Sequence, residues 1–294
     1  MMSSFDLSPF LAKHQLPQHY ADIAQAWFLP LAEQLAKKQQ QHAKTLIIGI
    51  NGAQGSGKST LTDLLVSTFK QSLGLSAVAL SLDDFYLSKQ QRQHLADTVH
   101  PLLATRGVPG THDVELAINI LQQLNSSTRT VIIPRFDKAI DDRLPQAEWQ
   151  VCSAPVDIIV VEGWCLGVQA QTDISLTTAC NDLEQQQDKD GRWRQYVNQQ
   201  LVNHYPALFS QLDELIMLQA PSFDCVYQWR LQQEQKLAKQ LTQQQSTTGV
   251  MTEQALQRFI MHFQRLTEHG LATLPMQADV TFELDENRQI TNRY

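Results

Sequence analysis

The sequence predicts an α/β fold with a doubly wound, mostly parallel sheet flanked by helices, and three observations support this. Short apolar runs alternate with helical patterns along the 294-residue chain, as they do where helices connect parallel strands. The run at residues 45–50 is almost entirely apolar, which is typical of a strand buried on both faces. A glycine-rich loop that ends in Lys58 and Ser59 follows this run directly.

The segment before residue 45 is predicted to be a helical extension of the main domain. Residues 17–40 carry apolar side chains at spacings of three and four, the pattern of an amphipathic helix. These side chains are Tyr20, Ile23, Trp27, Leu31 and Leu35. Pro30 lies inside the pattern and is expected to kink the helix or divide it in two. We therefore divide the chain into a helical N-terminal extension at residues 1–44 and a single domain at residues 45–294.

After the first strand, helical and strand patterns alternate to the end of the chain. Helices are expected at residues 58–72, 113–124, 182–205, 223–244 and 252–269. Further strands are expected at residues 76–82, 130–133, 156–161, 215–218 and 278–284. Residues 83–112 are polar and contain histidine and proline, so we predict an irregular, functional segment there.

Residues 52–59 read Gly-Ala-Gln-Gly-Ser-Gly-Lys-Ser, which fits the pattern of a phosphate-binding loop. Glycines let backbone N–H groups turn toward phosphate oxygens, and the following helix directs the positive end of its dipole at the same anion. The alternative, a glycine-rich turn with an incidental lysine, is disfavoured because a strand precedes the loop and an amphipathic stretch follows it. The expected nucleotide-binding residues are Gly52, Ala53, Gln54, Gly55, Ser56, Gly57, Lys58, Ser59 and Thr60.

Two oxygen-bearing side chains are candidates for a Mg²⁺ site, and one lysine for the phosphates. Lys58 is expected to reach the β- and γ-phosphates, and the Ser59 hydroxyl is expected to hold Mg²⁺. Glu162 directly follows the apolar run at residues 156–161. A carboxylate at such a strand end suits a ligand of Mg²⁺ or of its bound water, and the alternative is a structural salt bridge.

Asp83 is the candidate general base, because it directly follows the second predicted strand. A carboxylate at that position can orient an acceptor hydroxyl and take its proton. Successive side chains along a strand point to opposite faces, so Asp83 and Asp84 are not expected to face the same phosphate. The alternative for either residue is a helix cap or a loop hydrogen bond.

Several basic side chains follow strand ends or lie in the polar segment, where they are candidates for binding a substrate carboxylate or the transferred phosphoryl group. They are Arg106, His112, Arg135 and Lys138. Arginine suits a carboxylate because its planar fork donates two parallel hydrogen bonds. Arg230, on the predicted helix at residues 223–244, is a candidate lid arginine over the nucleotide. The alternative in each case is an ordinary solvated charge.

Composition narrows the class of partner. The net charge is −7 and the pI is near 5.7, which argues against a nucleic-acid partner, although a local basic cluster is enough for a small anionic substrate. No apolar run approaches the roughly 18 residues that cross a bilayer, and no signal segment is visible, so we expect no membrane partner and a cytoplasmic location. Four cysteines without a C-x-x-C pair indicate free thiols and argue against zinc. The oligomeric state stays open.

Six segments together carry a family resemblance. They are the loop Gly52 to Thr60, Ser81-Leu82-Asp83-Asp84-Phe85-Tyr86-Leu87, Arg106-Gly107, Pro134-Arg135-Phe136, Glu162-Gly163-Trp164-Cys165-Leu166-Gly167 and Tyr227-Gln228-Trp229-Arg230-Leu231-Gln232. This combination resembles the D-glycerate 3-kinases of the plant and fungal type, within the phosphoribulokinase, uridine kinase and pantothenate kinase group of phosphate-loop (P-loop) kinases. The resemblance extends from about residue 45 to the C-terminus. It implies a P-loop kinase fold, ATP and Mg²⁺ as cofactors, and Asp83 as the base.

We therefore expect an ATP-dependent kinase that phosphorylates a hydroxyl of a small hydroxy acid, with D-glycerate as the first choice. Uridine, pantothenate or a sugar phosphate are alternative acceptors. A second hypothesis is a regulatory ATPase or nucleotide switch, which the absence of an Asn-Lys-x-Asp guanine-recognition string disfavours. A third, an inactive nucleotide-binding scaffold, is disfavoured because every expected catalytic group is present.

Overall fold

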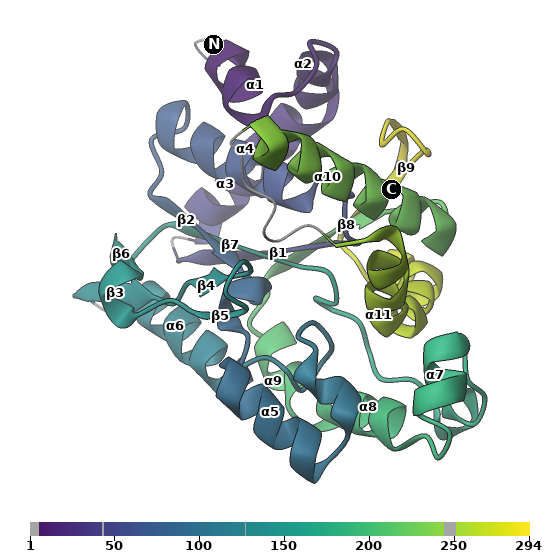
Figure 1. Cartoon of the computed structure of the whole chain (residues 1–294). Coiled ribbons are helices and arrows are strands. Elements are labelled where there is room, and N and C mark those ends of the chain that lie inside the picture. Colours follow the sequence, from purple (N-terminus) through teal and green to yellow (C-terminus); the bar gives the residue numbers. More distant parts are fainter. Residues whose placement is uncertain (1–5, 43, 127, 244–250) are drawn as a thin grey trace.

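A six-stranded sheet forms the centre of the computed structural model, which describes residues 6–42, 44–126, 128–243 and 251–294 (Figure 1). The strands lie in the order β10, β9, β8, β1, β7, β2. They are β1 (Leu46–Gly52), β2 (Ala77–Ser81), β7 (Ile158–Gly163), β8 (Glu214–Gln219), β9 (Val280–Leu284) and β10 (Ile290–Arg293). All neighbouring pairs are parallel except β9 and β10. The predicted doubly wound, mostly parallel sheet is confirmed.

Helices cover both faces of this sheet. Every residue of β1 and β7 is buried, and strands of this kind need a helical layer on each side. In Figure 1, α3 (Leu29–His42) and α4 (Lys58–Gln71) lie on one side of the sheet, and α6 (Val114–Ser126) and α8 (Arg192–Asn203) lie on the other.

Four further helices follow β7 along the chain. They are α7 (Asp182–Gln187), α9 (Tyr205–Phe209), α10 (Phe223–Gln243) and α11 (Glu253–Thr273). The helix predicted at residues 182–205 is divided into α7 and α8. The division occurs at Asp188, whose carboxylate accepts the backbone N–H groups of Trp193 and Arg194 and so begins α8.

Residues 83–112 are more regular than predicted. They contain α5 (Lys89–Thr98), which lies between 3₁₀ turns at Leu82–Phe85 and Pro101–Ala104. The periodicity of apolar residues missed α5 because the helix buries only Arg92 and Ala96. The sequence signal that was available is a capping box, in which Ser88 and Gln91 satisfy each other's backbone N–H groups.

The strand predicted at residues 130–133 exists but lies outside the central sheet. β3 (Thr130–Ile133) pairs antiparallel with β6 (Gln150–Ser153), and β4 (Phe136–Asp137) pairs with β5 (Asp142–Arg143) in a hairpin between them. Side chains of β3 alternate between exposed and buried, so this strand has one buried face, unlike β1. Apolar content alone did not distinguish the two cases.

The N-terminal extension packs on the main domain. It contains α1 (Ser8–His14), which the sequence did not predict, then α2 (Tyr20–Ile23), a π turn at Ala24–Phe28 and α3. Pro30 has no N–H to donate, and the change from α to π hydrogen bonding just before it divides the predicted helix as expected. Apolar side chains of the extension belong to the same hydrophobic cluster as the strands of the sheet.

Two expectations from composition can be compared with the described part of the chain. None of its helices is both long enough and apolar enough to cross a membrane. All four cysteines are free thiols, as expected. Burial raises the pKa of the Cys165 thiol well above its usual range, which makes that thiol chemically inert at neutral pH.

A buried arginine holds the irregular region between β2 and α6 together. The Arg92 guanidinium donates to the carbonyls of Leu87, Ala104 and Asp141, at 3.2, 2.6 and 2.6 Å. It also pairs with the Asp141 carboxylate at 3.0 Å. Asp141 lies in the turn of the β4–β5 hairpin, so one side chain fastens that hairpin to α5 and to the loop that follows it.

Replacing Arg92 by Met should destabilise the protein by about 2–4 kcal/mol, because three carbonyls lose the guanidinium donor, and a buried acceptor left unsatisfied costs about 1–3 kcal/mol. Urea unfolding followed by circular dichroism measures this change. Gln90→Ala, on the exposed face of the same helix, is the control and should stay within about 0.5 kcal/mol. Equal effects of the two substitutions would contradict the anchoring role.

Candidate active site

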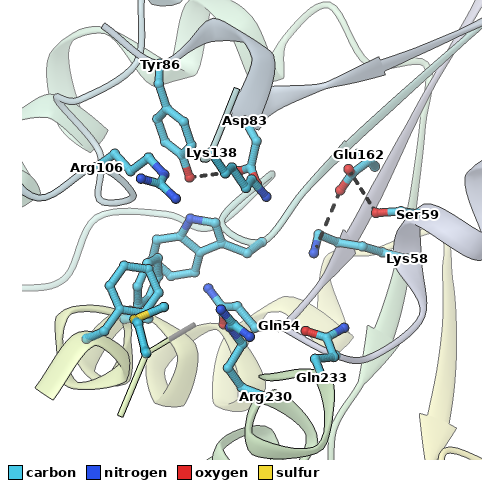
Figure 2. Close-up of a pocket in the computed structure, with 15 residues that line it drawn as sticks. Gln54, Lys58, Ser59, Asp83, Tyr86, Arg106, Lys138, Glu162, Arg230 and Gln233 are labelled. Carbon is cyan, nitrogen blue, oxygen red and sulfur yellow. Dashed lines mark hydrogen bonds and ion pairs between the residues drawn. The ribbon is translucent and has the colours of Figure 1, made fainter. Parts of the chain in front are cut away.

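A cavity of about 330 Å³ opens at the carboxyl edge of the sheet (Figure 2). Its walls come from the loop after β1, the ends of β2 and β7, the β4–β5 hairpin, and helices α10 and α11. The labelled side chains that line it are Gln54, Lys58, Ser59, Asp83, Tyr86, Arg106, Lys138, Glu162, Arg230 and Gln233. Ligands of open α/β sheets bind at this edge, so the cavity is the candidate active site.

The loop between β1 and α4 has the backbone that an anion cradle requires. Gly55 and Gly57 adopt φ values of +81° and +95°, which residues with a side chain rarely adopt. Gly55 also packs against Trp229, and a Cβ at Gly55 would lie 2.6 Å from the Trp229 Cβ. Lys58 is the first residue of α4, so the positive end of that helix faces the loop.

Two buried polar groups of the loop lack a partner. The side-chain oxygens of Gln54 and Ser56 have no hydrogen bond to the described residues, although buried polar atoms ordinarily have one. Backbone N–H groups of a glycine-rich loop bind phosphate oxygens. The loop therefore fits a polar, anionic ligand such as polyphosphate, as the sequence predicted.

Glu162 joins the loop to the end of β2. Its Oε1 accepts hydrogen bonds from Ser59 Oγ at 3.1 Å and from Ser81 Oγ at 2.7 Å, while Lys58 Nζ lies 3.8 Å from its Oε2. The Glu162 Oε2 atom is buried and accepts no hydrogen bond from the described residues. A carboxylate and the serine hydroxyl of a phosphate loop are oxygen ligands that Mg²⁺ takes beside phosphates, so Glu162 and Ser59 fit that ion.

Asp83 is held between a tyrosine and a lysine. Tyr86 OH donates to its Oδ1 at 2.8 Å, and Lys138 Nζ donates to its Oδ2 at 2.6 Å (Figure 2). Burial by itself raises the pKa of Asp83, but the ammonium groups of Lys138 and Lys58 outweigh it and hold the pKa well below its usual range. The Asp83 carboxylate is therefore ionised at neutral pH and able to accept a hydrogen bond.

Asp84 faces away from the cavity and has a structural partner. Its Oδ2 accepts from Arg135 Nη1 at 2.8 Å, and its Oδ1 accepts from the Phe136 backbone N–H at 3.1 Å. Burial raises the pKa of Asp84 despite these partners. Strand alternation predicted that only one of the two aspartates would face the site, and the geometry agrees, with Asp83 on the cavity side.

The structure brings three of the predicted cations to the cavity. Arg106, Lys138 and Arg230 line it. Arg106 pairs with Asp141 and lies 5.5 Å above the Phe136 ring, and Arg230 pairs with Glu234 at 2.7 Å along α10. Together with Lys58 they outnumber the carboxylates of Asp83 and Glu162 among the lining residues, because the carboxylates paired with Arg106 and Arg230 lie outside the lining.

The structure leaves two of the predicted cations outside the lining. Arg135 donates to Asp84 and to Gln150, and so ties the β4–β5 hairpin to its surroundings. His112 lies behind Tyr86, with the two rings stacked at 4.6 Å. Tyr205 OH accepts the backbone N–H of Gly110 and lies 2.6 Å from His112 Nδ1, so it holds the ring behind Tyr86.

Several lining residues were not identified from the sequence. Tyr86 stood in a quoted motif without a role, and so did Ser81, which donates to Glu162 beside the cavity. Trp164, another residue of a quoted motif, lines the cavity, and its indole N–H donates to the Gly107 carbonyl at 2.9 Å. Gln233, Met251, Phe259 and Phe263 complete the wall. Met251 lies just before α11, and the others come from α10 and α11, where no local signal separates a cavity wall from an ordinary apolar face.

Comparisons with a family profile and with individual proteins agree on one family of kinases. The profile of the Phosphoribulokinase / Uridine kinase family matches residues 47–190. The chain is similar to the uncharacterized kinase mug58 of Schizosaccharomyces pombe, with 31% identity over 86% of this chain and 93% of that one. It is also similar to the chloroplastic D-glycerate 3-kinase of Arabidopsis thaliana, with 29% identity over 83% of this chain and 53% of that one.

The fold has a solved counterpart. The structure of the D-glycerate 3-kinase from Cryptococcus neoformans var. grubii superposes with a TM-score of 0.72, covering 90% of this chain and 97% of that one. Sequence identity between the two is 24%, so the likeness concerns the architecture. The match covers more of this chain than the part from residue 45 to the C-terminus, where the resemblance was found, so it includes some of the N-terminal extension.

The buried, neutral His112 predicts a loss of stability in mild acid. Burial lowers its pKa to about 4, whereas an unfolded chain keeps about 6.5. Between pH 6.5 and 4 the unfolded state binds a proton at this residue and the folded state does not. The contribution of neutral His112 to the free energy of unfolding is therefore complete above pH 6.5 and is lost as the pH falls toward 4. Between pH 7.5 and 5 this residue should account for about 2 kcal/mol.

Urea unfolding at the two pH values checks this contribution. His112→Gln removes the titrating group, so its stability should fall less between pH 7.5 and 5 than that of the unmodified protein. His94→Gln, at an exposed position of α5, should leave the pH dependence as it was. The same pH dependence in all three proteins would show that His112 is not the buried neutral group described above.

Proposed function

Because the chain belongs to the phosphoribulokinase and uridine kinase family, in the branch that contains the D-glycerate 3-kinases of plants and fungi, we propose that it transfers the γ-phosphoryl group of ATP to a hydroxyl of a small hydroxy acid. D-glycerate is the acceptor that the relatives favour. The observation that carries the proposal is that a phosphate loop, a Mg²⁺ donor set, an ionised aspartate and an excess of cations line one cavity.

In this proposal the loop holds the phosphates. The amides of the loop and Lys58 bind the β- and γ-phosphoryl oxygens, and the N-terminus of α4 adds its dipole. Ser59 and Glu162 hold the Mg²⁺, with Ser81 orienting the glutamate. When bound, Mg²⁺ supplies positive charge that neutralises the phosphoryl oxygens during transfer.

Asp83 orients the acceptor hydroxyl and accepts its proton. The acceptor oxygen forms a bond to the γ-phosphorus, the bond from that phosphorus to the bridging oxygen breaks, and ADP leaves. With a depressed pKa, Asp83 is a weak base while Lys138 is paired with it. A weak base suffices because phosphoryl transfer has a loose transition state, in which the hydroxyl loses its proton late. Tyr86 keeps the carboxylate in place through its 2.8 Å hydrogen bond.

Arg106 and Lys138 bind the acid in this proposal, while Arg230 faces the phosphates from α10. Both acid-binding groups lie on the same side of the cavity as Asp83 (Figure 2), so a carboxylate bound there leaves a neighbouring hydroxyl within reach of Asp83. His112 and Arg135 act through others: His112 supports Tyr86, and Arg135 supports the hairpin that carries Lys138. The predicted cytoplasmic location stays a prediction, since the plant relative is named as chloroplastic.

A nucleotide switch or regulatory ATPase is the second candidate, because the phosphate loop alone serves either class. The cations of the acceptor side distinguish them, since a switch has no need of an acid-binding pocket. Coupled ADP release decides between the two: D-glycerate should stimulate it strongly, and uridine, pantothenate and ribulose 5-phosphate should not. Stimulation by none of these acceptors would remove the hydroxy-acid proposal.

Asp83→Asn should reduce kcat about 10² to 10⁴-fold, the usual contribution of a general base, while ADP binding measured by calorimetry stays unchanged. The matched control is Asp97→Asn, an exposed aspartate on α5, which should keep full activity. Full turnover by Asp83→Asn would exclude this residue as the base.

Arg106→Gln should raise the KM for the acid about tenfold or more, because hydrogen bonds between charged groups contribute about 1.5–3 kcal/mol. The KM for ATP should not change. Arg192→Gln, an exposed arginine far from the cavity lining, serves as control for loss of a positive charge. A parallel rise in both KM values would argue against a role in acid binding.

A further inference from the structure

Both carboxylate oxygens of the candidate base accept hydrogen bonds from the chain itself. Tyr86 OH donates to Asp83 Oδ1 at 2.8 Å, and Lys138 Nζ donates to Asp83 Oδ2 at 2.6 Å (Figure 2). An acceptor hydroxyl has to donate to the same carboxylate before it can transfer its proton. The proposed reaction therefore requires the acceptor to share an oxygen with one of these two donors or to replace it.

The two donors differ in how firmly they are held. The Tyr86 side chain is buried, and its ring stacks on His112 at 4.6 Å. The Lys138 side chain is 61% exposed, and the stem of a lysine is flexible over four carbons. Lys138 lies just after β4, on the exposed side of the β4–β5 hairpin. Of the two donors, Lys138 is therefore the one that can leave Asp83.

Arg106 is the cation that stays in place. Its guanidinium pairs with Asp141 and lies 5.5 Å above the Phe136 ring. Asp141 is held in turn by the buried Arg92, which pairs with it at 3.0 Å. Arg106 and Lys138 both line the cavity beside Asp83 (Figure 2). A carboxylate that binds Arg106 is thus fixed at one point, and the ammonium of Lys138 can reach it from the hairpin.

A substrate carboxylate changes the balance of charge around Asp83. Burial raises the pKa of Asp83, but Lys138, and after it Lys58, hold the pKa well below its usual range. A second anion in the cavity attracts the same ammonium. When Lys138 turns to that anion, Asp83 loses a nearby positive charge and becomes a stronger base. Its Oδ2 atom also becomes available to a hydroxyl.

We propose that Lys138 makes phosphoryl transfer depend on the carboxylate of the acceptor. Without that carboxylate, the lysine occupies Asp83 Oδ2 and keeps the base from orienting water or an uncharged alcohol. The carboxylate draws the ammonium away, and Asp83 then accepts the proton of the acceptor hydroxyl while its oxygen bonds to the γ-phosphorus and ADP leaves. This inference rests on the proposed function and deepens it, because it explains why a hydroxy acid receives the phosphoryl group and water does not.

A lysine that only binds the acid would behave differently. Its removal would weaken binding of the acid and would leave the reaction of ATP with water as it was. A lysine that also occupies the base restrains the reaction with water, so its removal accelerates that reaction. The rate of ADP release in the absence of an acid therefore separates the two roles.

The experiment measures ADP release from ATP and Mg²⁺ by the full chain with water alone, with glycerol and with D-glycerate. Glycerol keeps the carbon skeleton of glycerate and has an uncharged CH₂OH group in place of the carboxylate. We expect Lys138→Gln to raise ADP release without an acid about fivefold or more, because the base is freed. The preference for glycerate over glycerol should fall about tenfold or more, as for a lost hydrogen bond between charged groups.

Two further variants show whether the ion pair is responsible. Lys138→Arg keeps the positive charge and should keep ADP release without an acid low. Lys37→Gln removes an exposed lysine of α3 that lies outside the cavity lining, and should leave both measurements as they are in the unmodified protein. Equal acceleration by Lys138→Arg and Lys138→Gln would overturn the inference, because the hairpin and not the charge would then be the cause.

Unchanged or slower ADP release without an acid in Lys138→Gln would also overturn the inference and would leave Lys138 as an acid-binding group alone. So would an unchanged preference for glycerate over glycerol. Release with water alone needs no acceptor, so it is tested separately from the proposed function. If the unmodified protein phosphorylates no hydroxy acid, the proposed function is rejected, while faster release by Lys138→Gln would still show that this lysine restrains Asp83.

Discussion

The parallel pairing of β7 with both β1 and β2 is the constraint on which the site depends. In this register Glu162 lies opposite Ser81 on one neighbour and Ile50 on the other. Its carboxylate therefore reaches the phosphate loop and the end of β2 together, and accepts hydrogen bonds from Ser59 and Ser81. A shift of one residue would turn Glu162 to the other face of the sheet and separate these groups.

Charge at the site is the reverse of the charge of the whole chain. The chain has a net charge of −7, while the active-site cavity gathers Lys58, Arg106, Lys138 and Arg230 around two lining carboxylates. Two anions, a polyphosphate and an acid, can then share one cavity without strong repulsion. Lys138 links the two halves of this arrangement, because the group that attracts the acid also keeps Asp83 ionised.

Precision in the acceptor half comes from outside the central sheet. Arg92 donates to the turn of the β4–β5 hairpin, and Asp84 accepts the backbone N–H of Phe136 in β4. Arg143 donates to the Tyr86 carbonyl at 2.7 Å and to Asp113 at 3.0 Å. These contacts place Lys138 within 2.6 Å of Asp83. On the donor side, Arg288 and Trp229 hold the phosphate loop in a similar way. Short polar contacts to backbone atoms thus position both halves.

The fold class, the order of most elements and the phosphate loop could be predicted from the sequence, because they depend on local patterns. Strand periodicity and position in the chain also placed Asp83 and Glu162 at strand ends. The helix α5 was missed because it has no apolar stripe. The strand β3 was predicted, but it resembles a central strand until its distant partner β6 is known. Lining residues from α10 and α11 have no local signature of a cavity wall.

By itself, the sequence determined that the chain holds a phosphate loop at the end of a buried strand, with acidic groups at the ends of two others. Only the tertiary structure decided which cations share their cavity. It brought Arg106 and Lys138 to Asp83, turned Arg135 to Asp84 and buried His112 behind Tyr86. It also joined residues near the two ends of the chain into a second cavity beside the loop. The reason is physical: strand and helix patterns are local along the chain, whereas a site forms from side chains whose neighbours are set by long-range packing.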